Sequence, residues 1–299
     1  MIKESSKFTD GLVFEGMIGV GNGTVVIEDS KAEVDLAPQT NPGSNMRYGA
    51  ILGYHKGTAL TINNCQTSGV ISCGYSCNCS GGIVAYSGST SSTNIAQCKS
   101  AVAIKNDSGK QLSNSGGIVG CHGSAGTCTI ADCYSIGDME VRQTSGGLVG
   151  RHEKGTLSIT DSYSTSSLNG YSGLGSILGQ SASAGTLILT DCIAWASSIN
   201  ANRDGNDKYS SGAIVGAASG KSTITNCVRR SDMAFKDPYR TLTEHGNLNG
   251  VVHSGAANQQ AYDGRPTSES TVSAAAKAAG WSETVWDLTG DLPELKIFK

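Results

Sequence analysis

Three acidic residues, Asp132, Asp161 and Asp191, recur at steps of 29 and 30 residues, each directly before a cysteine or serine. Carboxylates repeated in this way can bind calcium or act as the acids of polysaccharide cleavage. Equivalent places elsewhere hold Asn64, Gln97 and Asn226. Because Asp and Asn also tolerate a left-handed backbone and cap turns, the pattern favours a row of polar bends over a catalytic or calcium-binding stripe.

Aromatic and imidazole side chains recur with the same spacing. Tyr134 and Tyr163 each follow the cysteine or serine, and together they can form an exposed two-ring platform for a sugar, although strand propensity favours ordinary strand aromatics. His122 and His152 occupy one repeat position, so we expect them on neighbouring coils about 5 Å apart. Two imidazoles can bind a metal, but no third ligand is evident, and we expect polar residues of a surface turn.

Five of the ten cysteines fall at one repeat position, where serine replaces them in other copies. An inward-facing cysteine packs as a small apolar residue, and stacking at one position is poor disulfide geometry. We therefore expect an internal ladder of free thiols. Its members are Cys65, Cys98, Cys133, Cys192 and Cys227, with Ser30 and Ser162 in the same place. We expect no cofactor in this protein.

The other five cysteines allow several interpretations. Cys73, Cys77 and Cys79 offer three thiolates, but their spacing lacks the second pair typical of zinc sites, so free thiols or one disulfide are favoured. Cys121 and Cys128 bracket a short glycine-containing segment, and a local disulfide between them fits an oxidising compartment.

The element that must position these residues is a repeat with a Gly-apolar-apolar-Gly core. The first apolar residues of its six copies are separated by 32, 35, 30, 29 and 37 residues. A Thr-rich alternating strand follows each copy, and a third, weaker strand completes the coil. This predicts an all-β protein, a parallel β-helix or β-solenoid of about seven coils. The copies are Tyr48–Gly53, Ser80–Ala85, Ser115–Gly120, Ser145–Gly150, Leu174–Gly179 and Ser211–Gly216.

The pattern changes near the C-terminus. We place the repeat domain at residues 1–255 and a cap at residues 256–299. Residues Ser268–Gly280 are rich in alanine and end in glycine, which predicts a short helix, and an apolar stretch with Trp281 and Trp286 follows. We expect this segment to cover the open sheet edge of the last coil.

Composition excludes several classes of protein. Glycine accounts for 40 of the 299 residues and charged residues for 16%, which is typical of turn-rich β structure. A formal net charge of −3 and scattered basic residues argue against nucleic-acid binding. No apolar run is long enough to span a membrane. Residues 1–10 lack the apolar core of a secretory signal, which leaves a removed export signal or a cytosolic location.

The Gly-Gly-Leu-Val-Gly core at residues 146–150 and its copies, each followed by a Thr-rich strand and Asp/Asn-Cys, resemble GLUG repeats. The resemblance covers most of residues 45–230 and implies a bacterial surface or secreted adhesin-like protein of Bacteroidetes type, sometimes found beside the protease domain of immunoglobulin-A-cleaving metallopeptidases. The zinc protease motif His-Glu-x-x-His is absent, since His152-Glu153 lacks the second histidine, so protease activity is not expected.

Three functions remain open. The leading hypothesis is a non-catalytic cell-surface or secreted protein that binds a host glycan or matrix protein through one face of the solenoid, with its oligomeric state open. The alternatives are a polysaccharide lyase or hydrolase and a structural stalk. Fold alone does not choose among them.

Overall fold

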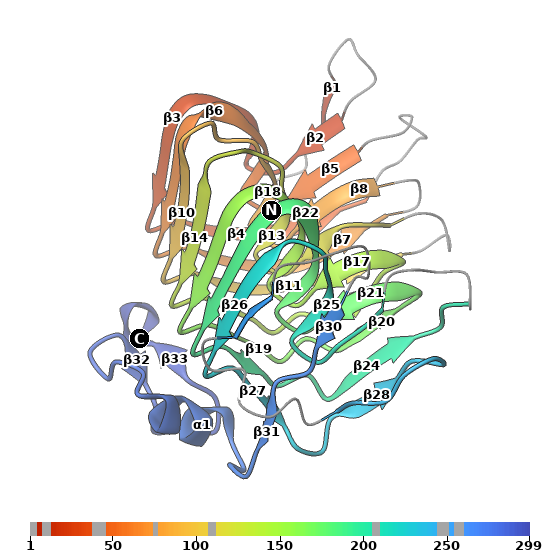
Figure 1. The fold of residues 1–299 in the computed structure, drawn as a ribbon. Coiled ribbons are helices and arrows are strands. Elements are labelled where there is room, and N and C mark those ends of the chain that lie inside the picture. The colour runs from red at the N-terminus through yellow and green to blue at the C-terminus, as the bar shows by residue number, and fades with distance from the viewer. Residues whose placement is uncertain are drawn as a thin grey trace.

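The computed structural model describes residues 5–7, 13–37, 46–73, 77–106, 112–204, 210–243, 251–253 and 260–299, and it shows a parallel β-solenoid (Figure 1). Three sheets run along the stack, and successive coils add strands to each. Seven Thr-rich strands follow one another in parallel register, separated by six turns of the coil. The predicted all-β solenoid of about seven coils is confirmed.

The first sheet, here the long sheet, contains the Thr-rich strands. Their alternating pattern buries every second residue, and one row places Ile62, Ile95 and Ile130 directly above one another inside the coil. Stacking in register supplies the backbone hydrogen bonds and the apolar core together. The strands are β3 (Ile18–Glu28), β6 (Leu52–Asn63), β10 (Ser92–Ala96), β14 (Thr127–Ala131), β18 (Val149–Thr160), β22 (Leu178–Thr190) and β26 (Lys221–Thr225), with the shorter β9 (Val84–Ser87), β13 (Val119–His122) and β25 (Val215–Ala218).

The second sheet, here the glycine sheet, ends at the repeat core. A Cβ on Gly146 would overlap the carbonyl oxygen of Val149, and one on Gly150 would overlap the backbone of the preceding coil at Gly120. Glycine is therefore required at both ends of the motif because the backbone approaches itself there. The apolar residues between them, such as Leu148, are fully buried. The strands are β1 (Ser5–Lys7), β2 (Val13–Glu15), β5 (Met46–Gly49), β8 (Cys77–Gly81), β12 (Ser115–Gly116), β17 (Gln143–Gly146) and β21 (Ser172–Gly175).

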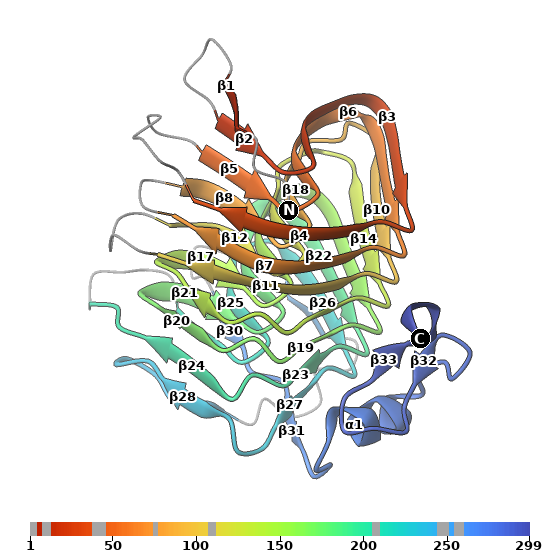
Figure 2. The ribbon, with the colours of Figure 1, turned by 180° about the vertical axis from the view of Figure 1, so that it is seen from behind.

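The third sheet, here the flank sheet, forms the face toward the viewer in Figure 2. It is continuous in the first coils and splits into two short strands in later coils. Its strands are β4 (Lys31–Leu36), β7 (Gln66–Ser72), β11 (Lys99–Lys105), β15 (Tyr134–Ser135), β16 (Met139–Glu140), β19 (Tyr163–Ser164), β20 (Leu168–Gly170), β23 (Ile193–Ala194), β24 (Ser198–Ala201), β27 (Val228–Arg230), β28 (Ala234–Lys236) and β31 (Arg265–Thr267).

The cysteine ladder marks the corner between the long sheet and the flank sheet. Its five cysteines are free thiols with buried side chains, as the sequence predicts. The Cys133 thiol donates to the carbonyl of Ala131 at 3.2 Å, and the Ser162 hydroxyl makes the equivalent bond to Thr160 at 2.7 Å. A small side chain able to donate to this carbonyl explains why only cysteine and serine occur there.

The residue before each ladder position adopts a left-handed backbone, which confirms the predicted row of polar bends. The φ angles lie between 46° and 55°. Asn and Asp tolerate this conformation better than most residues, and the sharp bend turns the chain into the flank sheet. The seven positions are Asp29, Asn64, Gln97, Asp132, Asp161, Asp191 and Asn226.

The C-terminal segment contains the expected helix, α1 (Val272–Ala279), which ends at Gly280 with φ of 81°. The sequence predicted that the helix and the apolar stretch after it cover the edge of the last coil. In the structure, other strands cover that edge, and the helix and the apolar stretch pack elsewhere. β29 (Val251–His253), β30 (Gln260–Tyr262) and β31 pair with the last strands of the stack. The helix and the hairpin β32 (Trp286–Asp287) and β33 (Glu294–Leu295) lie instead beside the flank, with the 3-10 turn η1 (Lys296–Phe298) after them (Figure 2). The boundary placed at residues 255 and 256 lies outside the described residues.

Candidate binding surface

The tyrosine pair predicted as a possible sugar platform is covered. Tyr134 and Tyr163 stack with ring centroids 4.9 Å apart, and their exposed fractions are 4% and 0%. Trp281 and Trp286 pack over them, and the Tyr163 hydroxyl donates to the carbonyl of Pro293 at 2.8 Å. The pair is therefore the docking site of the C-terminal segment, and the exposed platform is wrong.

The three aspartates lie beside the same contact. The indole of Trp286 donates to the Asp132 carboxylate at 2.9 Å, and the indole of Trp281 donates to the carbonyl of Asp191 at 2.9 Å. Burial, and then repulsion from Asp132 and Asp191, raises the pKa of Asp161 to about 6. The described residues contain no group of three or more His, Cys, Asp or Glu side chains placed to hold a metal ion.

The predicted histidine pair is present but faces inward. His122 and His152 stack with ring centroids 5.4 Å apart, close to the expected spacing, and both are fully buried. Burial lowers the pKa of each imidazole to about 4. The expected surface turn is wrong because the long sheet folds over these residues, so neither ring reaches an external ligand.

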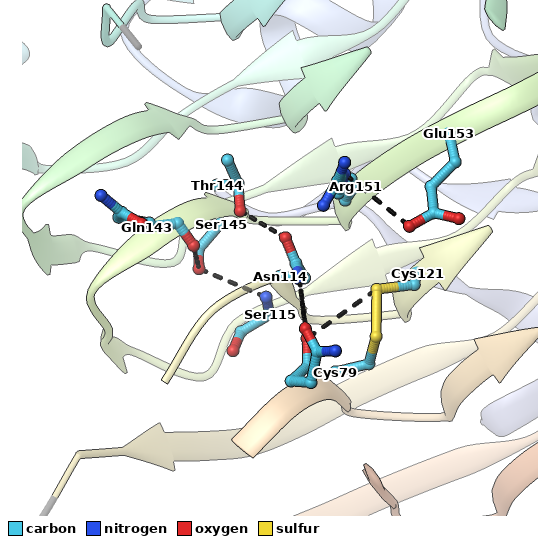
Figure 3. The surroundings of a disulfide bond; sticks show 10 residues. Cys79, Asn114, Ser115, Cys121, Gln143, Thr144, Ser145, Arg151 and Glu153 are labelled. Carbon is cyan, nitrogen blue, oxygen red and sulfur yellow. Dashed lines mark hydrogen bonds and ion pairs between the residues drawn. A yellow bond between two sulfur atoms is a disulfide. The ribbon is translucent and has the colours of Figure 1, made fainter. Parts of the chain in front are cut away.

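Four of the remaining cysteines form two disulfides, Cys73 with Cys77 and Cys79 with Cys121. The local bridge from Cys121 to Cys128 is wrong, since Cys128 is a buried free thiol. Figure 3 shows the Cys79–Cys121 bond, which joins the glycine sheet to β13 of the next coil, with Asn114 beside it. Two of the three thiols that suggested zinc are thus tied to each other, and the third is tied to a different coil.

An open groove lies at another corner, where the flank sheet leads into the glycine sheet. The strands β20 and β24, which precede some of its residues, are on the right of Figure 1. This amide groove has a volume of about 500 Å³ and crosses several coils. Polar side chains line most of it, with one aromatic ring. The lining residues are Asn106, Glu140, Val141, Arg142, Asn169, Gly170, Tyr171 and Asn202.

Backbone hydrogen bonds between coils fix the groove. The Tyr171 amide donates to the carbonyl of Arg142 at 2.7 Å, and the Asn202 amide donates to the carbonyl of Gly170 at 3.0 Å. The Arg142 backbone amide donates to the carbonyl of Leu112 at 2.8 Å. Side chains that follow the last flank strand of each coil are therefore held in successive rungs, which makes the groove a preformed feature of the stack.

The side chains of the groove offer hydrogen bonds, one ring and both signs of charge. The Arg142 guanidinium carbon lies 5.7 Å from the centroid of the Tyr171 ring, within range of a cation–π contact. Asn169, Asn202 and Glu140 are exposed. The sequence prediction missed this site. Its signal was an Asn, Arg or Tyr directly after the weak third strand, in the stretch where the repeat length varies.

No protein-family model and no curated protein matches the sequence. Among solved structures, the fold is similar to the crystal structure of a protein from Bacteroides ovatus described as a putative immunoglobulin A1 protease. The two chains are 19% identical with a TM-score of 0.59, over 91% of this chain and 75% of the other. The likeness shows a shared fold. Among the described residues, no helix is long and apolar enough to cross a membrane.

Proposed function

We propose that this chain is a non-catalytic surface or secreted scaffold that binds a glycan in the amide groove. The observation that carries the proposal is the groove itself: asparagine side chains on several coils beside a half-buried tyrosine. Asparagine amides donate and accept hydrogen bonds, as sugar hydroxyls do, and an aromatic ring packs on the apolar face of a pyranose.

The compartment is supported by the cysteine chemistry. Disulfides persist mainly in oxidising environments, and the Cys73–Cys77 and Cys79–Cys121 pairs favour an extracellular or cell-surface location. The resemblance to GLUG repeats and the fold shared with a Bacteroides protein point to the same setting.

Binding is favoured over polysaccharide cleavage by the number of acids in the groove. Glycosidases use a pair of carboxylates that flank the scissile bond. Among the described residues that line the groove, Glu140 is the one carboxylate. Asp132 accepts a hydrogen bond from the C-terminal segment, on the flank that this segment covers.

A glycan array tests the proposal, with wild type compared with the Asn169→Ala/Tyr171→Ala double variant. We expect wild type to bind a defined subset of glycans and the double variant to lose about tenfold or more in affinity, since each lost hydrogen bond or ring contact is worth about 1 kcal/mol. Asn94→Ala, an exposed asparagine of β10 on the long sheet, is the matched control. If the double variant binds glycans as well as wild type does, the groove is not the binding site. If wild type binds no glycan on the array, a structural stalk is favoured over a binding protein.

A further inference from the structure

The charged residues of the amide groove point to the class of glycan. We propose, resting on the glycan-binding function above, that the groove selects acidic sugars by pairing the Arg142 guanidinium with an anionic substituent, a carboxylate or a sulfate, on a ring held beside Tyr171.

Arg142 differs from the arginines around it in having no acidic partner. Within the described residues, no carboxylate lies within ion-pair distance of its guanidinium, and its Nε is buried without a hydrogen-bond partner. Two coils further along the stack, Arg203 is neutralised by Asp237 through two bonds of 2.8 and 2.9 Å. Other paired arginines are Arg151 with Glu153, Arg230 with Asp232 and Arg240 with Asp263.

A half-buried guanidinium that has no carboxylate partner favours an anion beside it, because burial without a countercharge is costly. Arginine is suited to this role because its planar fork matches carboxylate and sulfate oxygens. The contact with the Tyr171 ring and the backbone bond between Tyr171 and Arg142 restrain the side chain before any ligand arrives.

The rest of the molecule does not attract polyanions in general. The chain carries a formal net charge of −3, and Glu140 lies in the groove itself. An acidic polymer drawn only by long-range charge would therefore be repelled, and selectivity has to come from the local pairing at Arg142. In this proposal the carboxylate of Glu140 accepts hydrogen bonds from sugar hydroxyls. It also repels a second acidic substituent of the ligand at the part of the groove where Glu140 lies.

The test is the binding of three oligosaccharides of equal length measured by titration calorimetry at two salt concentrations. They are an oligogalacturonate, the same oligomer after chemical reduction of its carboxyl groups, and a sulfated galacto-oligosaccharide. We expect wild type to bind the acidic oligomer at least about tenfold more tightly than the reduced one, the usual effect of one charge-assisted hydrogen bond. Tighter binding of the sulfated sugar identifies sulfate as the natural anion, and tighter binding of the galacturonate identifies carboxylate.

Arg142→Gln should bring the acidic and reduced oligomers to equal affinity, while Arg142→Lys retains part of the preference. Arg151→Gln, which removes a paired surface arginine, is the matched control and should keep the full preference. Equal binding of the acidic and reduced oligomers by wild type overturns the inference whether or not the variants fold. If both bind equally and Asn169→Ala/Tyr171→Ala abolishes binding, the glycan-binding function stands alone. If none of the three binds and the glycan array is also empty, both proposals fall.

Discussion

Tyr163 and Tyr171 belong to the same coil, eight residues apart, yet they differ in what covers them. Tyr163 is fully buried beneath Trp281 and Trp286 on the flank, whereas Tyr171 is half-buried in the open amide groove. Both rings stand on outward positions of the solenoid. The difference teaches that in this fold the role of an outward residue depends on whether another segment of the chain returns to cover it.

The covered part of the flank sheet and the amide groove also differ in the environment of their ionisable groups. Around the covered flank and the closed interior, ionisable groups shift toward their neutral forms, as for Asp161 and His122. In the groove, Arg142 and Glu140 remain in contact with solvent. Stability should therefore respond to changes on the flank and in the interior, and binding should respond to changes in the groove.

The largest effect is expected from Trp286→Ala. This fully buried indole packs on both stacked tyrosines and donates to Asp132, so its loss should lower the free energy of unfolding by about 3–5 kcal/mol. Urea denaturation followed by circular dichroism measures it. Tyr171→Ala in the groove is the control and should cost less than about 1 kcal/mol. Similar losses for the two variants would contradict the distinction between flank and groove.

Acid should destabilise the interior through two buried histidines, and the effect of each ring taken singly should be smaller than that of Trp286→Ala. Because the folded state holds the pKa of His122 and His152 near 4, below the usual value of 6.5, the unfolded chain binds more protons between these values. The histidine contribution to stability is therefore complete above pH 6.5 and is lost as pH falls toward 4, by up to roughly 3 kcal/mol for each ring.

Denaturation midpoints between pH 7 and pH 4 measure this loss. His152→Ser is the matched variant, since Ser87 and Ser181 occupy the same position in other coils. It should flatten the pH dependence by about half. A variant that keeps the full slope would assign the acid sensitivity to other groups.

The smallest effect is expected from Asp161→Asn at the edge of the covered flank. Burial and two neighbouring carboxylates raise the pKa of Asp161 to about 6, so the ionised form destabilises the fold above that pH. The amide should raise the free energy of unfolding by less than about 1 kcal/mol at pH 7. The gain should shrink as pH falls below 6 and vanish near pH 3, below the usual pKa of 3.8, where Asp161 is protonated in both states. A gain that persists at about pH 3 would point to packing instead of charge.

Much of the fold follows from the sequence because each coil repeats the same physical requirement. Gly146 and Gly150 are needed where the backbone meets itself, and Asp132 stands where the backbone is left-handed. These are local constraints, and they recur with the period of the stack. The disulfide from Cys79 to Cys121 did not follow, because it depends on which side chains face each other across two strands of different sheets.

The candidate binding surface was harder to predict for a related reason. Tyr134 and Tyr163 show a perfect repeat, yet their cover comes from residues more than a hundred positions away, and periodicity carries no information about it. The groove residues Arg142, Tyr171 and Asn202 lie where the repeat length drifts, so an alignment of the motif passes over them. The regular positions build the scaffold, and the irregular ones line the groove in which we propose a ligand site.

The bond from Trp286 to Asp132 joins residues 154 positions apart. During synthesis, each coil can pack on the one before it as soon as it leaves the ribosome, but the flank sheet stays uncovered there until residues 281–295 have been made. Tyr134 and Tyr163 are exposed until then, and Trp281 and Trp286 bury them. The same segment contacts more than one coil, since Trp286 bonds to Asp132 and Trp281 to Asp191, so we expect a pull on Lys299 to load these contacts together before a coil separates. We therefore expect the contacts of this segment with the flank sheet to be the last part of the fold to form, and to determine how the stack unfolds under force.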